Sequence, residues 1–329
     1  MKHSTTPPID VAYVHDICQM IKEQIGHVVV GYESVIDNLL ICLITKGHMY
    51  MIGVPGIAKT TLAKSFAMVT GLTWNRVQFT QDVLPADIIG HYYFDQKENI
   101  FKLRKGPIFG ELILADEINR ASPKTQSALI EAMQERQVTI EGTTLLLPDP
   151  FFVIATKNPI ETEGVYQLPE AQLDRFLFSI SMDYLPRKQE EEMLRNKNRI
   201  SQDMFYRLKP ISDIKSIIGL HHHVYADTSI IQYIMNIIEE TRTQPQLLMG
   251  ASPRAAEHLL YASKASALIH GKDYVIPDDV KKVASNVLSH RLILSTEADL
   301  EGTSTKKIID DILTTVEIPD FVEVPTIHR

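Results

Sequence analysis

Short apolar runs alternate with stretches of helical periodicity through the first half of the chain. The runs cover residues 49–54, 76–80, 112–116, 151–156 and 178–184. Strands that are almost continuously apolar and alternate with helices are typical of a parallel sheet covered on both faces. The pattern therefore predicts an α/β domain with a five-stranded parallel sheet flanked by helices.

The strand pattern stops after the last of these runs, and only helical periodicity follows. It covers residues 187–199, 227–243, 252–270 and 277–290. Ser252 is a candidate N-cap, and Pro253 suits the first helical position because its missing N–H leaves no hydrogen bond unmade. We expect the α/β domain in residues 1–186 and a small all-helical domain in residues 187–329.

Two segments of the first half have a period of two instead. Residues 90–110 alternate around the polar tip Glu98–Asn99, and residues 138–148 alternate around Gly142. Alternation on both sides of a short turn is typical of a β-hairpin. Both segments are predicted to be hairpins that project from the α/β domain.

Composition narrows the class of protein. The length of 329 residues is typical of two domains, and the net charge of -8 without a Lys/Arg block does not favour nucleic-acid binding. Cys18 and Cys42 lie far apart, which indicates buried thiols rather than a disulfide or zinc site. The longest apolar run, Leu39–Ile44, is far shorter than the ~20 residues of a membrane span, so we expect a cytoplasmic protein with no span.

The segment GVPGIAKTT has the context of a phosphate-binding loop, because it follows a predicted strand and precedes a helix. Its backbone N–H groups and the helix N-terminus would hold phosphates. Lys59 is expected to reach the β and γ oxygens, and Thr60 to bind Mg²⁺. The residues expected to bind ATP here are Gly53, Val54, Pro55, Gly56, Ile57, Ala58, Lys59, Thr60 and Thr61.

Ala58 stands where the phosphate-loop motif has its last glycine. A Cβ atom is tolerated at this position if the backbone remains near a right-handed conformation. Ala58 therefore weakens the motif without abolishing it, and we expect a loop that still binds nucleotide. Without other motifs, a tight turn between strand and helix is the alternative.

Two carboxylate residues stand where the apolar strand LILAD ends: Asp116 is its last residue, and Glu117 follows. Asp116 and Glu117 would lie at the carboxyl edge of the parallel sheet, where α/β proteins bind ligands. Asp116 suits the outer sphere of Mg²⁺, and Glu117 suits polarising a water for attack on the γ-phosphate. A charged strand end without a ligand is the alternative for either residue alone.

Further polar residues complete a candidate hydrolytic site. Asn158 follows the strand FFVIAT and could hydrogen-bond the attacking water or the γ-phosphate. Arg120, Arg175 and Arg254 are candidates for stabilising the charge of phosphoryl transfer, from the same subunit or a neighbour. Surface salt bridges are the alternative for each arginine.

Together these segments resemble the MoxR-type AAA+ ATPases, relatives of the magnesium-chelatase ATPase subunit. The resemblance spans roughly residues 28–290. It includes the segments VVVGYESVI, GVPGIAKT, QFTQDVLPADIIG, FFVIATKNPIETEGVYQLPEAQLDRF, GASPRA and the long segment from Lys105 to Gly142. The family usually has alanine where Ala58 stands.

The resemblance implies a role for each matching residue. Lys59, Thr60, Asp116 and Glu117 resemble the Walker A and B residues, and Asn158 resembles the sensor 1 residue. Arg175 resembles an arginine finger that acts in trans. Arg254 resembles the sensor 2 arginine of the lid, acting in cis or across an interface. Val29, Val30 and Gly31 resemble the segment that packs on adenine, followed by Tyr32 where the family usually has glutamine.

The resemblance also implies how the protein works. Members of the family are similar to ring-forming AAA+ proteins, typically hexamers, and act as chaperone-like remodellers of partner proteins. Many cooperate with proteins that carry a von Willebrand factor A domain. The hairpin in residues 90–110 resembles the helix-2 insertion of this clade, which could pass ATP-driven motion to a protein client.

Three other functions remain open from the sequence. A small-molecule P-loop kinase is disfavoured by Glu117 and the arginine finger, which activate water and sense a neighbouring subunit. A nucleic-acid motor would depend on a few residues such as Lys102, Arg104 and Lys105. A nucleotide-binding adaptor with negligible turnover is the third alternative.

Overall fold

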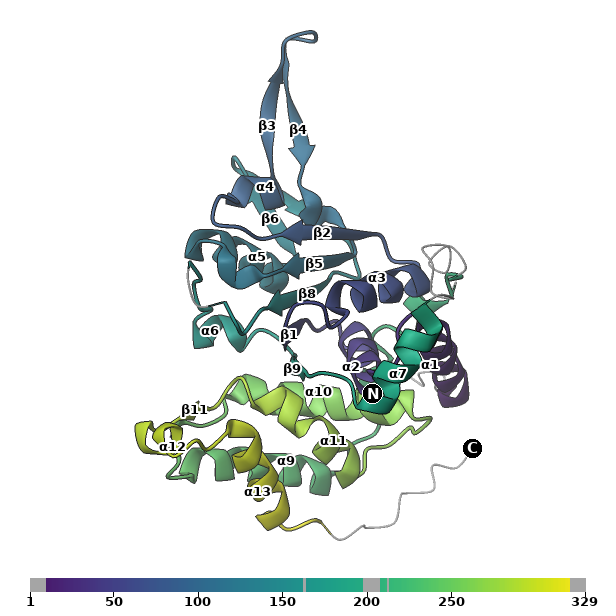
Figure 1. Cartoon of the computed structure of the whole chain (residues 1–329), viewed down its shortest axis with the longest axis vertical. Coiled ribbons are helices and arrows are strands. Elements are labelled where there is room, and N and C mark those ends of the chain that lie inside the picture. The colour runs from purple at the N-terminus through teal and green to yellow at the C-terminus, as the bar shows by residue number, and fades with distance from the viewer. Residues whose placement is uncertain (1–9, 162–163, 198–207, 212, 320–329) are drawn as a thin grey trace, which may run out of the picture. The chain divides into compact units, whose positions relative to one another are not determined.

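The computed structural model describes residues 10–161, 164–197, 208–211 and 213–319. Its residues form two compact units. Among the described residues, one unit comprises those between 12 and 220, and the other comprises those from His221 onward together with Asp10 and Val11 (Figure 1). Helix α7 thus belongs to the first unit, and the boundary at residue 186 remains a prediction.

A five-stranded parallel sheet organises the first unit. Its strand order is β2-β5-β8-β1-β9, and all the pairings are parallel. The strands are β1 (Met49–Gly53), β2 (Trp74–Gln78), β5 (Leu112–Asp116), β8 (Phe152–Lys157) and β9 (Phe178–Met182). The five-stranded parallel sheet predicted from the apolar runs is confirmed.

Helices cover both faces of this sheet (Figure 1). The helices up to residue 197 are α1 (Val11–Gly26), α2 (Glu33–Ile44), α3 (Lys59–Thr70), α4 (Pro85–Ile89), α5 (Pro123–Glu135), α6 (Glu170–Leu173) and α7 (Arg187–Lys197). Short 3₁₀ turns are η1 (Pro107–Phe109), η2 (Ile118–Arg120), η3 (Ile214–Ile217) and η4 (Leu220–His223).

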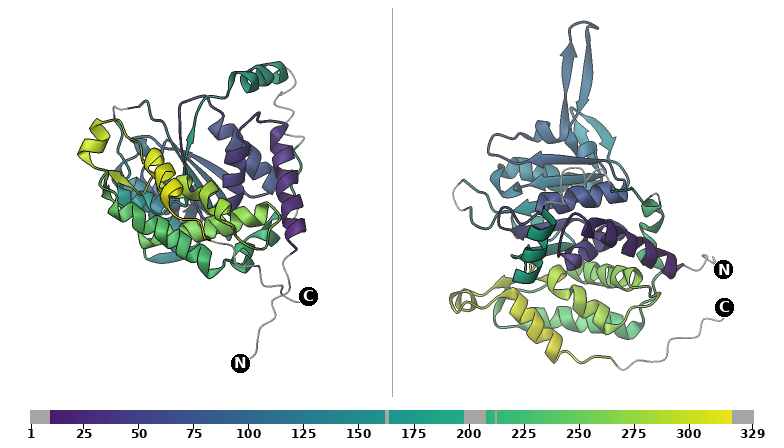
Figure 2. Two further views of the ribbon diagram at one scale, coloured as in Figure 1. Left: turned by 90° about the horizontal axis from the view of Figure 1, so that it is seen from below. Right: turned by 45° about the vertical axis from the view of Figure 1, so that its right-hand side comes forward.

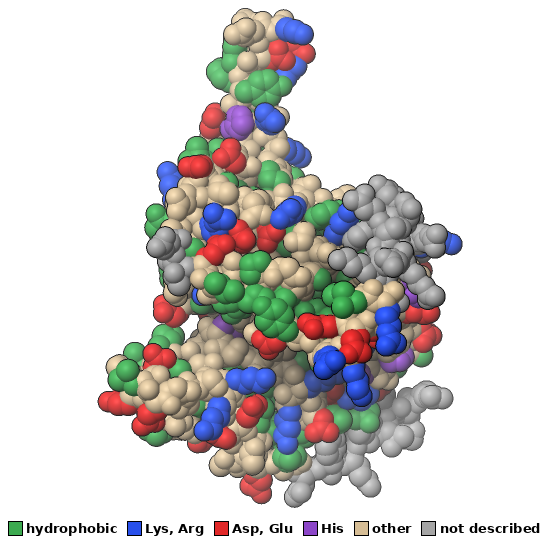
Figure 3. Space-filling model, in the orientation of Figure 1, with side chains coloured by type: hydrophobic (Ala, Val, Ile, Leu, Met, Phe, Trp, Pro, Cys, Tyr) green, Lys and Arg blue, Asp and Glu red, His purple; other side chains and the backbone are tan. Residues whose placement is uncertain are grey.

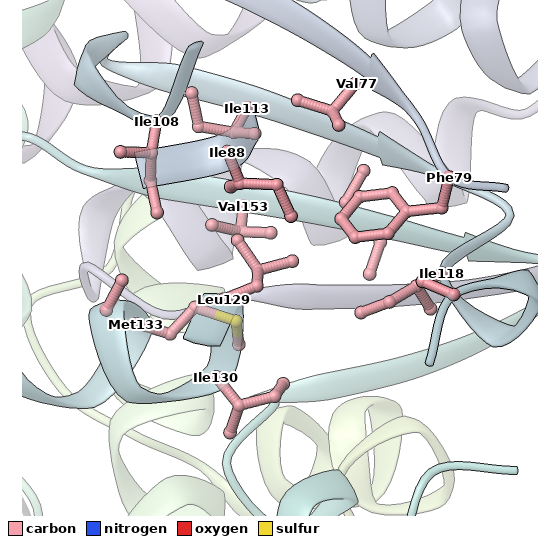
Figure 4. Packing of buried hydrophobic residues seen from close by; sticks show 14 of the residues in the cluster. Val77, Phe79, Ile88, Ile108, Ile113, Ile118, Leu129, Ile130, Met133 and Val153 are labelled. Carbon is pink, nitrogen blue, oxygen red and sulfur yellow. The ribbon is translucent and has the colours of Figure 1, made fainter. Parts of the chain in front are cut away.

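Alternate residues of the buried strands pack on opposite faces of the sheet. Ile113 and Val153 contribute to a cluster with Leu129 and Met133 of α5 (Figure 4). On the other side, Phe66 of α3 packs edge-on against Phe152, with ring centroids 6.2 Å apart. Full burial of one such side chain contributes about 1.5–3 kcal/mol, so these two layers hold the sheet and its carboxyl edge in place.

The cysteines occupy the helical layer. Cys18 of α1 and Cys42 of α2 are both free and buried. Burial raises the pKa of the Cys18 thiol to about 12. A buried thiol with a raised pKa is chemically inert, in agreement with the interpretation of the two cysteines as structural.

Two hairpins extend from this unit, as the period-two segments predicted. One consists of β3 (Gly90–Asp95) and β4 (Ile100–Lys105), and the other of β6 (Gln137–Ile140) and β7 (Thr143–Leu146). Figure 2 shows the first hairpin standing away from the sheet. Asn99 at its tip has φ 53°, the left-handed backbone that Asn tolerates in turns.

The second unit is mainly helical. Its helices are α9 (Thr228–Thr243), α10 (Pro253–Ile269), α11 (Pro277–Leu288), α12 (Thr296–Leu300) and α13 (Thr305–Thr315). Ser252 caps α10 by accepting a hydrogen bond from the N–H of Ala255 at 3.2 Å, as predicted. A short antiparallel pair, β10 (Leu247–Met249) with β11 (Ile293–Leu294), escaped the sequence patterns because strands of three and two residues have no readable period.

No helix among the described residues is both long enough and apolar enough to cross a membrane.

Candidate functional site

Three neighbouring strands bring the predicted phosphate-binding and hydrolytic residues together. Strands β5, β8 and β1 are adjacent and parallel. Asp116 ends β5, Asn158 follows β8, and the phosphate loop follows β1. Because the carboxyl ends of parallel strands meet at one edge, these residues share one site although they are far apart in the sequence.

The phosphate loop ends at the first residue of α3, Lys59. The Lys59 side chain is buried, and its Nζ donates to the carbonyl oxygen of Gly53 and, at 3.5 Å, to that of Lys157. Burial lowers the pKa of Lys59, while the carboxylates of Asp116, Glu117 and Glu161 act in the opposite direction. The ammonium group thus lies between the carbonyl oxygens of Gly53 and Lys157 and interacts with the carboxylates of the site.

Ala58 has a left-handed backbone, with φ 68° and ψ 17°. The right-handed backbone that would accommodate a Cβ atom without strain is therefore not present at Ala58. The chain must turn from β1 into α3 immediately before Lys59, and the left-handed residue makes that turn. Because a Cβ atom makes this region unfavourable by about 1–2 kcal/mol, the loop stores strain that a glycine would not carry.

The Ala58→Gly variant is expected to be as stable as the wild type or more stable by up to about 1 kcal/mol. Glycine removes the strain but increases the freedom of the unfolded chain, and the two effects partly cancel. Thermal unfolding measures the outcome. Ala67→Gly, inside α3, is the control and should lose about 1 kcal/mol. A comparable loss at Ala58 would contradict the strained turn.

Asp116 is held by three side chains. Thr156 Oγ1 donates to Oδ1 at 2.6 Å, and Thr60 Oγ1 lies 3.4 Å from Oδ2. Arg76 donates to Oδ2 through Nε at 3.1 Å and through a terminal nitrogen at 2.7 Å. The carboxylate of β5 is thereby fixed beside the hydroxyl at the start of α3, which is an oxygen pair suited to Mg²⁺.

Glu117 follows in a left-handed conformation with φ 57° and ψ 49°. Its N–H donates to Thr156 Oγ1 at 2.9 Å. Its Oε2 accepts from Gln78 Nε2 at 2.9 Å and from Arg120 at 3.1 Å. Strain of this kind is held only where the surroundings determine it, and here the hydrogen bonds of Thr156, Gln78 and Arg120 hold the residue.

Asn158 is buried and hydrogen-bonded on both sides of its amide. Its Oδ1 accepts from the N–H of Ile160 at 3.2 Å, and its Nδ2 donates to Glu161 Oε1 at 3.0 Å. Glu161 Oε2 lies 3.8 Å from Arg120 Nε. Arg120, for which the sequence left a salt bridge open, therefore connects two carboxylates of the site.

Arg175 and Arg254 occupy different units. Arg175 follows α6, and its Nε is buried without a hydrogen-bond partner among the described residues. Arg254 is exposed at the second position of α10. The structure thus leaves the Arg175 guanidinium with unused donor capacity in the single chain.

A cavity of about 270 Å³ adjoins the phosphate loop. Its lining residues are Val28, Val29, Val30, Tyr32, Pro55, Gly56, Ile57, Ala58, Thr61, Tyr184, Leu185, Glu190 and Met193. This lining is mostly apolar and contains Val29 and Val30 of the segment that resembles the one packing on adenine. Its size and its position beside the loop suit a purine base.

Tyr32 lines one wall of this cavity, and Gly31 precedes it in the chain. Gly31 has φ 74°, and a Cβ atom there would come within 2.7 Å of Leu185 Cδ2. Tyr32, at φ 64°, donates its hydroxyl to the carbonyl oxygen of Asp183 at 3.0 Å. The tyrosine that departs from the family pattern thus joins the wall of the cavity to the end of β9.

Sequence reasoning missed several residues of the site. Arg76, Gln78, Thr156 and Glu161 carry hydrogen bonds to the candidate residues. Arg76 and Gln78 lie on β2, whose alternating polar positions were a readable signal once β2 is placed beside β5. The wall formed by residues 184–193 had no such signal.

The phosphate loop, the paired carboxylates and the sheet order define a P-loop nucleotide hydrolase of the AAA+ class. Residues 48–178 match the family model "ATPase family associated with various cellular activities (AAA)", and residues 239–312 match the AAA lid domain. The chain is therefore an ATPase with an AAA core and a lid.

Two relatives match the chain over most of its length, and the name of the second identifies the family. "Uncharacterized protein YeaC" of Bacillus subtilis (strain 168) is 42% identical over 309 residues, covering 93% of this chain and 96% of the relative. "Chaperone MoxR1" of Mycobacterium tuberculosis (strain ATCC 25618 / H37Rv) is 40% identical over 323 residues, covering 95% and 85%. The chain belongs to the MoxR-type AAA+ ATPases.

Two further proteins are similar to this chain, one over almost its whole length and the other over less than half. The crystal structure of a proposed ATPase from Cytophaga hutchinsonii ATCC 33406 has a TM-score of 0.87 and 40% identity, covering 94% of this chain and 97% of that one. "von Willebrand factor A domain-containing protein 8" of Mus musculus is 25% identical over 141 residues, which cover 40% of this chain and 7% of the relative.

Proposed function

We propose that this ATPase uses Lys59, Glu117 and Asn158 to hydrolyse ATP in a ring, and that the ring remodels a partner protein. The observation that carries the proposal is the meeting of the phosphate loop, Asp116, Glu117 and Asn158 at the ends of three adjacent strands. In this arrangement Lys59 binds the β and γ oxygens, and Glu117 accepts the proton of the attacking water.

The nucleotide contacts proposed for the loop are those expected from the sequence. Gly53 to Thr61 hold the phosphates, and Val30 and Gly31 contact the base beside the cavity. Thr60 and Asp116 fit Mg²⁺, because their oxygens lie 3.4 Å apart at the start of α3. The metal would supply charge neutralisation for the phosphates.

Arg175 is proposed to complete the site of a neighbouring subunit. Its buried Nε lacks a partner among the described residues, and an unmet buried donor is unfavourable by about 1–3 kcal/mol. A guanidinium with unused donors suits the charge that develops in phosphoryl transfer. We therefore propose a homo-oligomeric ring, a hexamer by family resemblance, with Arg254 of the lid as a second arginine sensing nucleotide.

The β3–β4 hairpin is proposed to contact the client. Phe94 and Phe101 pair across its strands with ring centroids 5.2 Å apart, yet they remain 46% and 69% exposed. Figure 3 shows apolar and charged side chains interleaved along this projection. Exposed aromatic groups on an element this prominent suit a protein partner.

Lys102, one of the basic residues on which a nucleic-acid motor would depend, is engaged within the hairpin. Lys102 pairs with Asp95 at 2.8 Å and with Glu98 at 2.5 Å, so its charge is locally balanced. We propose a client with a von Willebrand factor A domain. The partial match to a protein named for that domain supports this choice.

Affinity capture with the Glu117→Gln form tests the remodelling function. With ATP it should retain a specific protein that the wild type with ADP releases, and mass spectrometry identifies that protein. Adding Phe101→Ser should abolish retention, whereas Leu300→Ser, at an exposed residue of the second unit, should not. Recovery of nucleic acid alone would contradict the proposed client class.

A further inference from the structure

Glu161 lies three positions after Asn158. It has no role in nucleotide binding assigned above, yet it contacts residues that do. Its Oε1 accepts the Nδ2 hydrogen bond of Asn158 at 3.0 Å. The other face of the Asn158 amide is occupied by the N–H of Ile160. The orientation of Asn158 is thereby determined, and its donor group is engaged by Glu161.

The same carboxylate faces Arg120. Glu161 Oε2 is 3.8 Å from Arg120 Nε, while Arg120 donates to Glu117 Oε2 at 3.1 Å. Arg120 thus spans Glu117 and Glu161. A movement of Glu161 therefore changes the interactions of Arg120, which in turn restrains the proposed general base Glu117.

Glu161 also acts on the phosphate-loop lysine. Burial lowers the pKa of Lys59, and the charge of Glu161, after those of Asp116 and Glu117, partly offsets the lowering. One carboxylate therefore faces an amide donor, a guanidinium and an ammonium group. Phosphate oxygens of a bound nucleoside triphosphate would use the same kinds of group, and two anions there would repel each other.

We propose that Glu161 is a positioning residue that substitutes for the γ-phosphate at Asn158 until ATP replaces it there. The inference rests on the proposed roles of Lys59 and Asn158 in nucleotide binding. With ADP, Glu161 keeps its contacts. With ATP, Asn158 exchanges Glu161 for the γ-phosphate, Glu161 turns toward Arg120, and Arg120 releases Glu117 for proton abstraction.

This exchange affects how strongly the protein prefers ATP over ADP. ATP must displace the carboxylate, so its apparent affinity is reduced by the fraction of molecules in which Glu161 blocks the γ-phosphate position. ADP has no γ-phosphate and does not compete. Glu161 therefore lowers the affinity for ATP relative to that for ADP. It also couples the release of Glu117 from Arg120 to the binding of a triphosphate.

Calorimetric titration of the full chain with Mg²⁺ tests the inference. Probes are ADP and a non-hydrolysable ATP analogue, and variants are Glu161→Gln, Glu161→Ala and Glu131→Gln. Glu131 is exposed on α5 and provides a control for the loss of one negative charge. Both Glu161 variants should bind the analogue about tenfold more tightly, with ADP affinity unchanged, whereas Glu131→Gln should change neither.

The outcomes separate the possible roles of Glu161. An unchanged ratio of the two affinities in both Glu161 variants would overturn the inference, even if both nucleotides bound more weakly. Glu161→Ala serves if Glu161→Gln does not fold. If the wild type binds both ADP and the analogue but the Glu161 variants leave the ratio of the two affinities unchanged, only the proposed role of Glu161 is refuted. Wild-type protein that binds neither would instead refute the proposed nucleotide site.

Discussion

The Glu117→Gln variant is expected to hydrolyse ATP about 10²–10⁴ times more slowly than the wild type while still binding it. Glutamine keeps the size of the side chain and an oxygen that can accept from Gln78 and Arg120. It cannot accept the proton of an attacking water. Binding depends on the phosphate loop after β1, which the substitution does not touch.

Steady-state phosphate release and calorimetric ATP binding measure these two effects separately. Lys59→Ala is the contrasting variant, because it removes the ammonium group of the loop and should abolish binding as well as hydrolysis. A Glu117→Gln protein that hydrolyses ATP at the wild-type rate would exclude Glu117 as the general base. Loss of ATP binding in that variant would show a structural role instead.

The Arg175→Ala variant is expected to lose hydrolysis about 10³-fold or more, with ATP binding by each subunit preserved. The reason is the proposed contribution of its guanidinium to the site of a neighbouring subunit. Arg187→Ala is the matched control, because the Arg187 side chain is 92% exposed and pairs along its own helix with Glu191 at 3.1 Å. Arg187→Ala should retain wild-type hydrolysis.

Mixing of inactive subunits distinguishes action in trans from action in cis. Arg175→Ala subunits keep Lys59, and Lys59→Ala subunits keep Arg175. A mixed ring therefore contains complete sites at some interfaces, and measurable hydrolysis should return. If Arg175 acted within its own subunit, every site in the mixture would lack one group and activity would stay absent.

Local sequence patterns were sufficient for most of the helices and strands. The apolar run ending in Asp116 predicted a buried strand, and β5 is buried along its whole length. The period of two around Glu98–Asn99 predicted the hairpin that the structure shows. Ser252 and Pro253 predicted the start of α10. These features depend on neighbouring residues, which is why they can be read without a structure.

The backbone conformations of Ala58 and Glu117 could not be predicted from neighbouring residues. Ala58 takes a left-handed conformation against its own preference, because β1 and α3 must meet at a fixed angle around it. Glu117 does the same between β5 and η2. Local preference predicts the opposite at both positions, since the penalty is compensated by packing elsewhere in the unit.

The sequence by itself determined the parallel sheet, the phosphate loop, the paired carboxylates and the family to which they belong. Only the tertiary structure decided which side chains restrain them. Arg76 reaches Asp116 because β2 lies beside β5, and Glu161 reaches Arg120 because the segment after β8 lies beside η2. Periodicity reports which face of an element is buried, whereas partners distant in sequence are chosen by the packing of the whole unit.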